Sequence, residues 1–472
     1  MLLVAAALRA PLLAGGQIDY DEGVYWQSLR SLAAGHQLFA SVYSSQPPAF
    51  LLTLMPAYLL LGGTIVAARI TVLVVALLGI AAAGRAVWLL AGPAAGLLAA
   101  ALVAADPLLF RQSVTLQADG PAIAFGLVAV AAAAEARRHP GRPAVLLAVG
   151  AGAVLAVAVL TKLLAAAAFP AVIVLLVAPP MTAPSAIRLL GAAALGCVGA
   201  VAGLLLPFIG VWSDLWAQAV GFHLGARSVG LGGLDAPTYL TELPIAALGA
   251  VGFLIALWRA PLLAATGAAW TLATTLILLV QHPLWPHHAV ALAAPLALLG
   301  GAVAIWLTPS PGFAGYSPDP PPPKAGFAGT PGAGERLRRP AAVGFAVLLL
   351  AAAVTSAAYV RTQQEPDAKV EPAVSALRAS TAPGDLVISD DQFATALAGR
   401  STPPELVDTS LVRVKSGDLT VDELMVMAER WHVRAVLLRT DRLAAVPGLQ
   451  AWLEQHFPKS MHLGTVGTLY LR

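Results

Sequence analysis

The chain has 472 residues, of which 58% are hydrophobic and only 11% are charged. Soluble globular proteins carry about 25% charged residues, so this composition excludes an ordinary soluble protein. The formal net charge of +3 is too small to indicate nucleic-acid binding. The single cysteine, Cys197, lies in an apolar stretch, which excludes a disulfide framework and a cysteine-based zinc motif.

The charges are distributed unevenly along the chain. Residues 361–472 contain 12 Lys and Arg and 14 Asp and Glu, whereas residues 1–360 contain only 16 and 11. We therefore predict an all-α polytopic membrane domain followed by a small extracytoplasmic α/β domain at the C-terminus. The long N-terminal part would lie in the lipid bilayer, and the short C-terminal part in water.

About 11 segments are apolar and approach the roughly 20 residues that a helix needs to cross the hydrocarbon. The first of them is short, and a signal-peptide core is the alternative interpretation for it. The predicted spans are 2–16, 64–84, 94–108, 119–136, 143–160, 163–180, 187–209, 241–258, 261–281, 287–307 and 341–360.

One further apolar run, 48–62, is only 15 residues long and contains Pro56. Three arginines between 137 and 142 mark a cytoplasmic loop by the positive-inside rule. Counting spans back from that loop places both ends of 48–62 on the outer face, if the N-terminus is cytoplasmic. We expect a helix lying in the outer interface. The alternative is a full span, with residues 17–46 in the cytoplasm.

This topology describes a multi-pass protein of the cell (inner or plasma) membrane. Its N-terminus is cytoplasmic, and the segments 17–63, 109–118, 210–240 and everything after 360 lie outside. The Pro/Gly-rich composition of 308–340 predicts a disordered cytoplasmic linker. The expected organisation is a membrane core at 1–307 with an outer loop at 17–63, the linker at 308–340, a last span at 341–360 and the α/β domain at 361–472.

The C-terminal domain shows two buried strands by their apolar runs, at 384–389 and 433–438. Thr420 and Glu423 predict a capping box at the start of a helix that runs through Trp431. A helix at 448–457 and a hairpin (462–464 and 467–471) follow. The domain lacks a glycine-rich phosphate loop, and Asp390 and Asp391 are expected in a solvated loop.

Acidic residues are rare in the membrane part, because each costs several kcal/mol if it is desolvated near the bilayer. Asp19, Asp21 and Glu22 nevertheless fall within four residues, directly after the first span on the expected outer face. Asp21 and Glu22 also open an amphipathic helix that includes Tyr25, so capping of that helix is the alternative role for them.

Two more ionisable residues lie where spans meet the outer face. Asp119 opens a span, so it is either a helix cap or a site residue. Lys162 closes the span 143–160, where it could extend toward water or bind an anion.

Histidines and one arginine complete the set on the outer face. His287 and His288 are candidates for phosphate or sugar contact, because their segment lacks the glutamate of a zincin motif. His223 and Arg227 share a predicted helix in 210–240 and are candidate substrate contacts. Ordinary interfacial packing is the alternative for all four. An acid suited to general-base catalysis and cations suited to a phosphate leaving group would serve glycosyl or phosphoryl transfer, and on this face a lipid-linked donor is the natural inference.

At these residues the sequence resembles a known family. Asp21, Glu22 and Tyr25, followed by Pro47 and Pro48, are similar to the acidic loop and double proline of the GT-C superfamily of membrane glycosyltransferases. The closest group is the family 39/83 type, which includes the aminoarabinose transferase and the protein O-mannosyltransferases. The resemblance covers roughly residues 1–310 and continues in the runs ADGPAIAF, LTKLLAA and WPHHAVALAAPLALL.

The resemblance implies inverting transfer of a sugar from a polyprenyl-phosphate donor to a hydroxyl of an acceptor protein, lipid or glycan. It implies Asp21 as general base, Asp119 as a second catalytic acid and Lys162 near the donor phosphate. It implies no cofactor firmly, and a divalent metal stays open although no metal ligands are assigned. The remaining candidates for substrate binding are Glu22, Tyr25, Gln46, His223, Arg227, His287 and His288.

One departure from the family concerns Ser45 and Gln46, which stand where many relatives carry an acid and a lysine before the double proline. Two other function classes remain open. A transporter or flippase would place ionisable residues at the bilayer midplane, often in repeated halves, but these spans carry few charges and show no repeat. A membrane-tethered binding protein would act through its C-terminal domain, which lacks a recognisable site.

Overall fold

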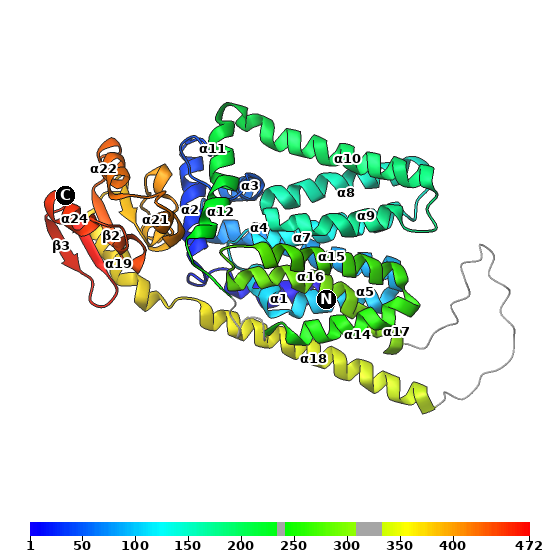
Figure 1. Cartoon of the computed structure of the whole chain (residues 1–472). Coiled ribbons are helices and arrows are strands. Elements are labelled where there is room, and N and C mark those ends of the chain that lie inside the picture. The colour runs from blue at the N-terminus through cyan, green and yellow to red at the C-terminus, as the bar shows by residue number, and fades with distance from the viewer. Residues whose placement is uncertain (234–240, 308–332) are drawn as a thin grey trace, which may run out of the picture.

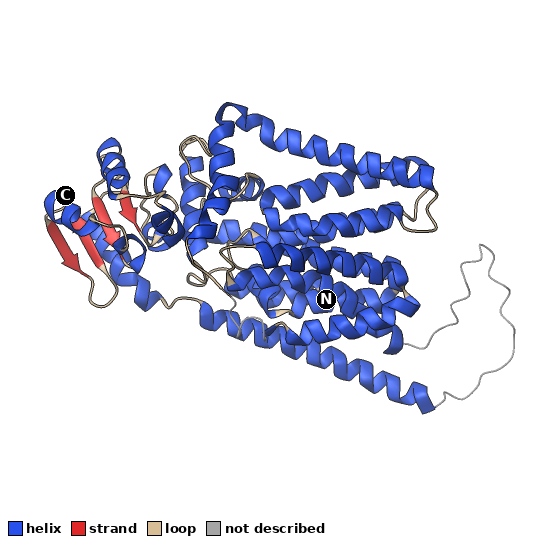
Figure 2. Cartoon of the chain, in the orientation of Figure 1, coloured by secondary structure: helices blue, strands red, loops and turns tan. Residues whose placement is uncertain are grey.

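The structure is a computed structural model that describes residues 1–233, 241–307 and 333–472. A long bundle of helices carries a small mixed α/β domain at one end, as Figures 1 and 2 show. The expected linker falls largely outside the described residues, as does the end of the expected outer segment 210–240.

The bundle contains helices that are joined by turns and loops. In chain order they are α1 (Leu2–Arg9), α2 (Tyr20–Ala33), α3 (Ala49–Leu60), α4 (Ile65–Ala91), α5 (Pro93–Ala105), α6 (Pro107–Gln112), α7 (Asp119–Ala136), α8 (Gly141–Thr161), α9 (Phe169–Val177), α10 (Ala183–Leu205), α11 (Trp212–Trp216), α12 (Phe222–Gly225), α14 (Leu243–Arg259), α15 (Pro261–Val280), α16 (Val290–Gly301), α17 (Val303–Leu307) and α18 (Ala333–Gln363).

The described residues contain seven helical runs that are long and apolar enough to cross a membrane, together with five shorter apolar helices. All eleven predicted spans coincide with one of these helices. The twelfth apolar helix is α3, whose 12 residues extend about 18 Å at 1.5 Å per residue. That is well short of the roughly 30 Å of a hydrocarbon core, but α1 and α5 are about as short, so the interfacial position of α3 stays a prediction.

Glycine and proline set the boundaries and the closeness of these helices. Gly92 ends α4 with a φ of 92°, which favours glycine, and Pro93 starts α5 in the next turn. Helices α8 and α10 approach so closely that a Cβ at Gly152 would lie 1.8 Å from the Ala193 carbonyl oxygen. Small residues therefore allow these two backbones to touch, as is common between membrane helices.

The last bundle helix differs from its predicted extent. Helix α18 begins at Ala333 rather than near 341, so the end of the expected linker is helical. At its other end it reaches Gln363, beside the C-terminal domain (Figure 1). We call this end of the bundle the outer end. Helices α2, α3, α11 and α12, which belong to segments expected outside, lie there too, whereas α17 and the start of α18 lie at the opposite end (Figure 1).

The C-terminal domain contains a four-stranded sheet in the order β1–β2–β4–β3. Strands β1 (Val387–Ser389) and β2 (Ala435–Leu438) are parallel and buried, as their apolar runs predicted. Strand β4 (Thr468–Leu471) pairs antiparallel with β2 and with β3 (Lys459–His462). The helices of this domain are α19 (Asp367–Ser380), α20 (Gln392–Leu397), α21 (Leu411–Ser416), α22 (Val421–Arg430), α23 (Asp441–Ala444) and α24 (Leu449–His456).

Most of this domain confirms the sequence prediction, including the capping box of Thr420 and Glu423 on α22. Strand β3 begins three residues before its predicted position, because all four of its residues are exposed and give no apolar signal. The expectation of a solvated loop at Asp390 and Asp391 is wrong, since the two residues are 0% and 3% exposed.

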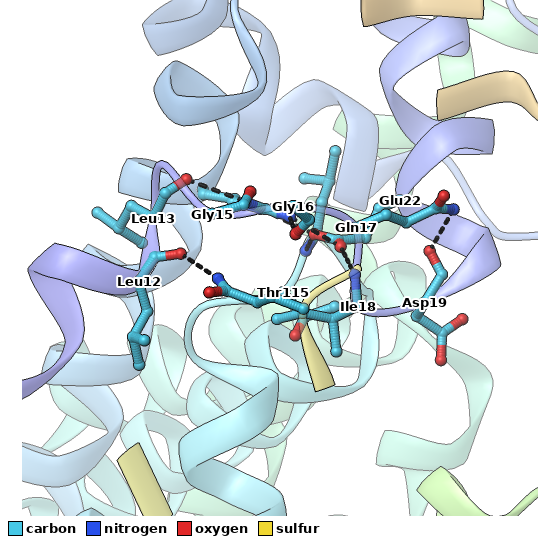
Figure 3. Close-up of polar contacts among 12 residues, drawn as sticks. Leu12, Leu13, Gly15, Gly16, Gln17, Ile18, Asp19, Glu22 and Thr115 are labelled. Atoms are coloured by element: carbon cyan, nitrogen blue, oxygen red, sulfur yellow. Dashed lines mark hydrogen bonds and ion pairs between the residues drawn. The ribbon is translucent and has the colours of Figure 1, made fainter. Parts of the chain in front are cut away.

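A buried ion pair fixes the turn between α1 and α2. Arg69 of α4 and Glu22 of α2 form two hydrogen bonds of 2.8 Å, and both side chains are fully buried. Arg69 also donates to the carbonyl oxygens of Leu13, Gly15 and Gly16. These contacts hold the turn of Figure 3 against the bundle.

Glu22 satisfies its remaining acceptor capacity with backbone groups. The amide of Ile18 and the amide of Leu116 each donate to its carboxylate at 2.8 Å. The carboxylate therefore joins the first outer turn to the loop before α7.

We predict that Glu22→Gln lowers the free energy of unfolding by about 3–5 kcal/mol, because removing one partner of a buried ion pair leaves the other charge uncompensated. Thermal unfolding of the purified protein in nanodiscs measures the change. The control is Glu135→Gln, whose partner Arg85 has a side chain 48% exposed, and whose loss costs about 0–1 kcal/mol. Equal unfolding temperatures for the two variants would contradict this assignment.

Candidate active site

A cavity of about 750 Å³ lies at the outer end, between the bundle and the C-terminal domain. Its walls are formed by the start of α2, the turn before the double proline, α12, the segments after α8 and before α16, the start of α21 with the loop before it, and the start of α23. Its apolar lining includes Leu163, Leu164, Phe222 and Trp285. Charged side chains, among them Asp21, Arg111, Lys162 and Arg442, line other parts of the same cavity.

The three acids of the first outer turn have three different roles. Asp19 is the N-cap of α2, accepts a hydrogen bond from the amide of Asp21, and pairs with Arg111 at 2.9 Å. Glu22 belongs to the buried pair with Arg69. Asp21 lines the cavity, and its carboxylate forms no hydrogen bond or ion pair with any described residue. The helix cap is thus Asp19, and Asp21 is left available to a ligand.

Burial raises the pKa of both Asp21 and Asp19, and the neighbouring charges then act differently on the two groups. Burial and then the negative charge of Asp19 raise the pKa of Asp21 to about 8, although Lys162 acts to lower it. Burial opposes ionisation of Asp19 as well, but His287, Arg111 and the Asp21 amide outweigh it, so the pKa of Asp19 lies below its ordinary value. Asp21 is therefore a carboxyl group that can take up a proton near neutral pH.

Lys162 lies in the cavity wall directly after α8 and pairs with Asp119 at the start of α7. Its Nζ lies 2.6 Å from Asp119 Oδ2, and the two side chains are 13% and 3% exposed. Asp119 makes no side-chain cap of α7, so capping is not its role. Its second oxygen, Oδ1, is buried and has no partner among the described residues. An ammonium group has three donors, so Lys162 can hold Asp119 and an anion together.

The histidines and Gln46 gather around the same space. His287 and His288 lie on the 3-10 turn η6 (Pro286–Ala289), and both line the cavity together with His223 and Gln46. His223 forms a hydrogen bond of 2.7 Å with the carbonyl oxygen of Ser45. This contact joins α12 to the double-proline turn, so the uncharged Ser45–Gln46 pair becomes part of the wall.

Three of these side chains could hold a divalent metal ion. Asp119, His287 and His288 each offer one ligand atom, and those atoms lie within 4.8 Å of one another. One carboxylate and two imidazoles are a donor set that suits zinc and similar ions. His288 Nδ1 accepts from the Trp285 amide at 3.3 Å, which leaves its Nε2 for a ligand. The prediction assigned no metal ligands, and spacing alone could not find this group because α7 and η6 are far apart in sequence.

The structure does not bring every predicted residue to the cavity. Glu22 is enclosed by Arg69 and backbone amides. Tyr25 is buried on the inner side of α2, where its ring packs edge-on against Phe50 at 4.7 Å. Arg227 is exposed and lies outside the cavity lining, one residue beyond Ala226. These three side chains lie outside the cavity lining, and the substrate contacts predicted for them stay predictions.

Sequence reasoning missed the side chains that other segments contribute. Arg111 comes from α6, and Tyr20 precedes Asp21 on α2. Asp408, Asp441 and Arg442 come from the C-terminal domain, whose charges look like ordinary solvation in the sequence. The only sign of Asp408, Asp441 and Arg442 in the sequence is that each lies near the start of a helix.

Tyr20 connects the two parts of the protein. Its hydroxyl accepts a hydrogen bond of 2.9 Å from the Thr409 amide, and the guanidinium of Arg442 lies 4.0 Å from the centre of its ring. The C-terminal domain therefore packs against the bundle and closes one side of the cavity.

The cavity combines a proton acceptor, several cationic side chains and an apolar part of its lining. Asp21 can accept a proton, while Lys162, Arg111 and Arg442 can offset negative charge on a phosphate. The apolar lining can accept the chain next to that phosphate.

Comparisons with known proteins address the fold. No protein-family model and no curated protein matches the chain. The crystal structure of ArnT from Cupriavidus metallidurans bound to undecaprenyl phosphate is similar with a TM-score of 0.67 and 16% identity, over 99% of this chain and 96% of that chain. The oligosaccharyltransferase AglB from Archaeoglobus fulgidus, in complex with an inhibitory peptide and a dolichol-phosphate, gives 0.55 and 13%, over 96% and 71%.

A further structure of the Archaeoglobus fulgidus oligosaccharyltransferase, in complex with Zn and sulfate, matches with a TM-score of 0.53 and 13% identity, over 95% of this chain and 70% of that chain. The chain thus has the fold of the GT-C membrane glycosyltransferases over nearly its whole length, the C-terminal domain included. The resemblance seen in the sequence is confirmed at the level of fold.

Proposed function

We propose that the protein is an integral membrane glycosyltransferase that moves a sugar from a polyprenyl-phosphate donor to an acceptor hydroxyl at the outer face. The observation that carries the proposal is Asp21, a carboxyl group without a partner among the described residues, in a cavity that also holds Lys162 and Arg111. The similarity in fold to ArnT bound to undecaprenyl phosphate supports a lipid-phosphate donor. The apolar lining at Leu163, Leu164 and Phe222 suits the first isoprene units.

The reaction that we propose is a single displacement. The acceptor oxygen attacks the anomeric carbon while its proton passes to Asp21, and the bond between that carbon and the phosphate oxygen breaks. The electron pair of the broken bond leaves with the polyprenyl phosphate, whose added charge Lys162 offsets. Attack from the face opposite the phosphate inverts the configuration at the anomeric carbon. The paired position of Asp119 orients Lys162 for this role.

We predict that Asp21→Asn lowers sugar transfer by about 10²- to 10⁴-fold, the usual contribution of a general base. A strain without the protein is complemented with wild type or variant, and its envelope glycolipids and glycoproteins are compared by mass spectrometry. The matched control is Asp214→Asn, an exposed aspartate on α11 at the same end of the bundle. Unchanged glycosylation with Asp21→Asn would show that another group is the base.

The pKa of Asp21, raised to about 8, sets the expected pH dependence. A base must be ionised, so kcat/KM for transfer should increase with pH, with about one tenth of the maximum at pH 7, about half near pH 8 and a plateau above about pH 9. Asp19→Asn removes the negative charge that raises this pKa and should move the profile to lower pH. A profile already level at pH 5 would contradict the assignment of Asp21.

We predict that Lys162→Met weakens binding of undecaprenyl phosphate by about tenfold or more, because a hydrogen bond to a charged group contributes about 1.5–3 kcal/mol. Binding is measured on the purified protein by microscale thermophoresis, with the exposed Lys415→Met as control. Lys162→Met leaves the buried carboxylate of Asp119 without a partner, which could destabilise the fold. The double variant Lys162→Met with Asp119→Asn removes that charge as well, so weak binding in both variants shows that the loss of affinity does not come from misfolding. Full affinity in Lys162→Met would exclude Lys162 as a phosphate contact.

A further inference from the structure

Part of the cavity wall, between α12 and the turn before the double proline, consists of polar side chains without a permanent charge. Ser45, Gln46 and His223 line the cavity there, and we call these three residues the uncharged patch. The proposed reaction uses charged side chains of the other walls and gives the patch no role.

Hydrogen bonds hold the two sides of this patch together. The Nε2 of His223 donates to the carbonyl oxygen of Ser45 at 2.7 Å. Gln218, on the turn before α12, accepts from the Ser44 amide at 3.0 Å and donates to the Phe39 carbonyl oxygen at 2.9 Å. The patch is therefore arranged before a ligand binds, which lowers the entropy cost of binding.

Each residue of the patch keeps a polar group without a partner among the described residues. These groups are the hydroxyl of Ser45, the side-chain amide of Gln46 and Nδ1 of His223. None of them is among the enclosed unpaired atoms of the described chain, so each retains accessible surface. Gln46 is only 9% exposed, so its amide meets little besides the cavity.

The Ser45 contact fixes the position of the proton on the imidazole of His223. A carbonyl oxygen only accepts, so the proton lies on Nε2, and Nδ1 of the neutral ring is an acceptor. Burial and the nearby charge of Lys162 lower the pKa of His223, although the Ser45 contact acts to raise it, so the ring is neutral at pH 7. Nδ1 therefore binds a group that donates a hydrogen bond, which a fully ionised phosphate cannot do.

The free groups of the patch match hydroxyls. A hydroxyl donates and accepts at once without a charge, while the Gln46 amide offers a donor and an acceptor and His223 Nδ1 offers an acceptor. A hydrocarbon chain would leave these groups unsatisfied. An ammonium or carboxylate group would lose hydration and find no opposite charge on the three side chains.

The position of the patch indicates which part of the donor it faces. Lys162, to which we assign the donor phosphate, is close enough to act electrostatically on His223. The groups next to that phosphate are the sugar and the first isoprene unit, and only the sugar carries hydroxyls.

We propose that Ser45, Gln46 and His223 bind the hydroxyls of the transferred sugar, and that this sugar is a neutral hexose or pentose without an ammonium or carboxylate group. This assignment rests on the proposed function and names the sugar class for it. The uncharged Ser45–Gln46 pair, which departs from the family pattern, is then a determinant of sugar specificity.

The test measures binding of short donor analogues to the full-length protein in nanodiscs by microscale thermophoresis. The neutral probes are the citronellyl phosphate esters of glucose, mannose, galactose and arabinose. The charged probes are the esters of aminoarabinose and glucuronic acid, and citronellyl phosphate alone measures the contribution of the phosphate. We expect at least one neutral ester to bind more tightly than citronellyl phosphate and than both charged esters. The proposal is overturned if no neutral ester does so.

Two variants assign the contribution of the sugar to the patch. Gln46→Leu removes the free amide, and His223→Gln keeps a donor for the Ser45 carbonyl oxygen but has no acceptor at the Nδ1 position. Each should weaken binding of the neutral ester by about 3- to 10-fold and leave binding of citronellyl phosphate unchanged. His462→Gln, at an exposed histidine of the C-terminal domain, is the control and should change neither. Equal losses for the ester and for citronellyl phosphate would place the patch at the phosphate and overturn the proposal.

A spectroscopic measurement on the wild-type protein keeps the proposal testable if a variant misfolds. Solid-state NMR of protein labelled with ¹⁵N-histidine should show His223 neutral at pH 7 with its proton on Nε2, and its Nδ1 signal should shift when the neutral ester binds. A protonated ring, or a signal that the ester leaves unchanged, would overturn the proposal. Binding of citronellyl phosphate and the effect of Asp21→Asn do not depend on these outcomes, so failure here is distinguishable from failure of the transferase assignment.

Discussion

The ion pair between Arg69 and Glu22 is the contact on which the active-site geometry depends. One buried guanidinium near the start of α4 binds a carboxylate and three carbonyl oxygens of the turn between α1 and α2. The same carboxylate binds the loop that leads to Asp119 through the Leu116 amide. Two charges buried together are tolerated because every remaining donor and acceptor finds a partner. The turn that presents Asp21 is thereby fixed relative to α7.

The three neighbouring acids of this turn have different contacts. Asp19 caps α2 and holds Arg111, Glu22 anchors the turn, and Asp21 alone faces the cavity without a partner among the described residues. Burial of the Asp21 carboxyl group, and then the negative charge of Asp19, raise the pKa of Asp21. A group that is held rigidly by its neighbours, yet is itself unpaired, is what general-base catalysis requires.

The second constraint is the docking of the C-terminal domain on the outer end. Tyr20 accepts a hydrogen bond from the Thr409 amide, and Arg442 lies over its ring, so one residue of α2 contacts the domain and lines the cavity. The bundle and the C-terminal domain each contribute part of the cavity lining, so the cavity forms only where the two pack together.

The sequence predicted the architecture well because apolar length is a strong signal. Every predicted span has a helix, and Thr420 begins its helix as its capping box indicates. It also predicted Asp21, Asp119 and Lys162 near one another through the resemblance. It could not separate Asp21 from Glu22, since that depends on Arg69, which lies 47 residues along the chain inside an apolar helix. Arg442 was missed and Asp390 was expected in a solvated loop, because charges in a hydrophilic domain carry no sign of burial.

The central claim is that the cavity holds the donor with its phosphate at Lys162 and its sugar facing Asp21. A cryo-EM structure of the protein in nanodiscs with an unreactive polyprenyl phosphonate sugar tests it most directly. The account predicts the phosphonate within hydrogen-bonding distance of Lys162 Nζ, with the anomeric carbon between it and the Asp21 carboxylate. A phosphonate bound elsewhere on the bundle, or a sugar turned away from Asp21, would contradict it.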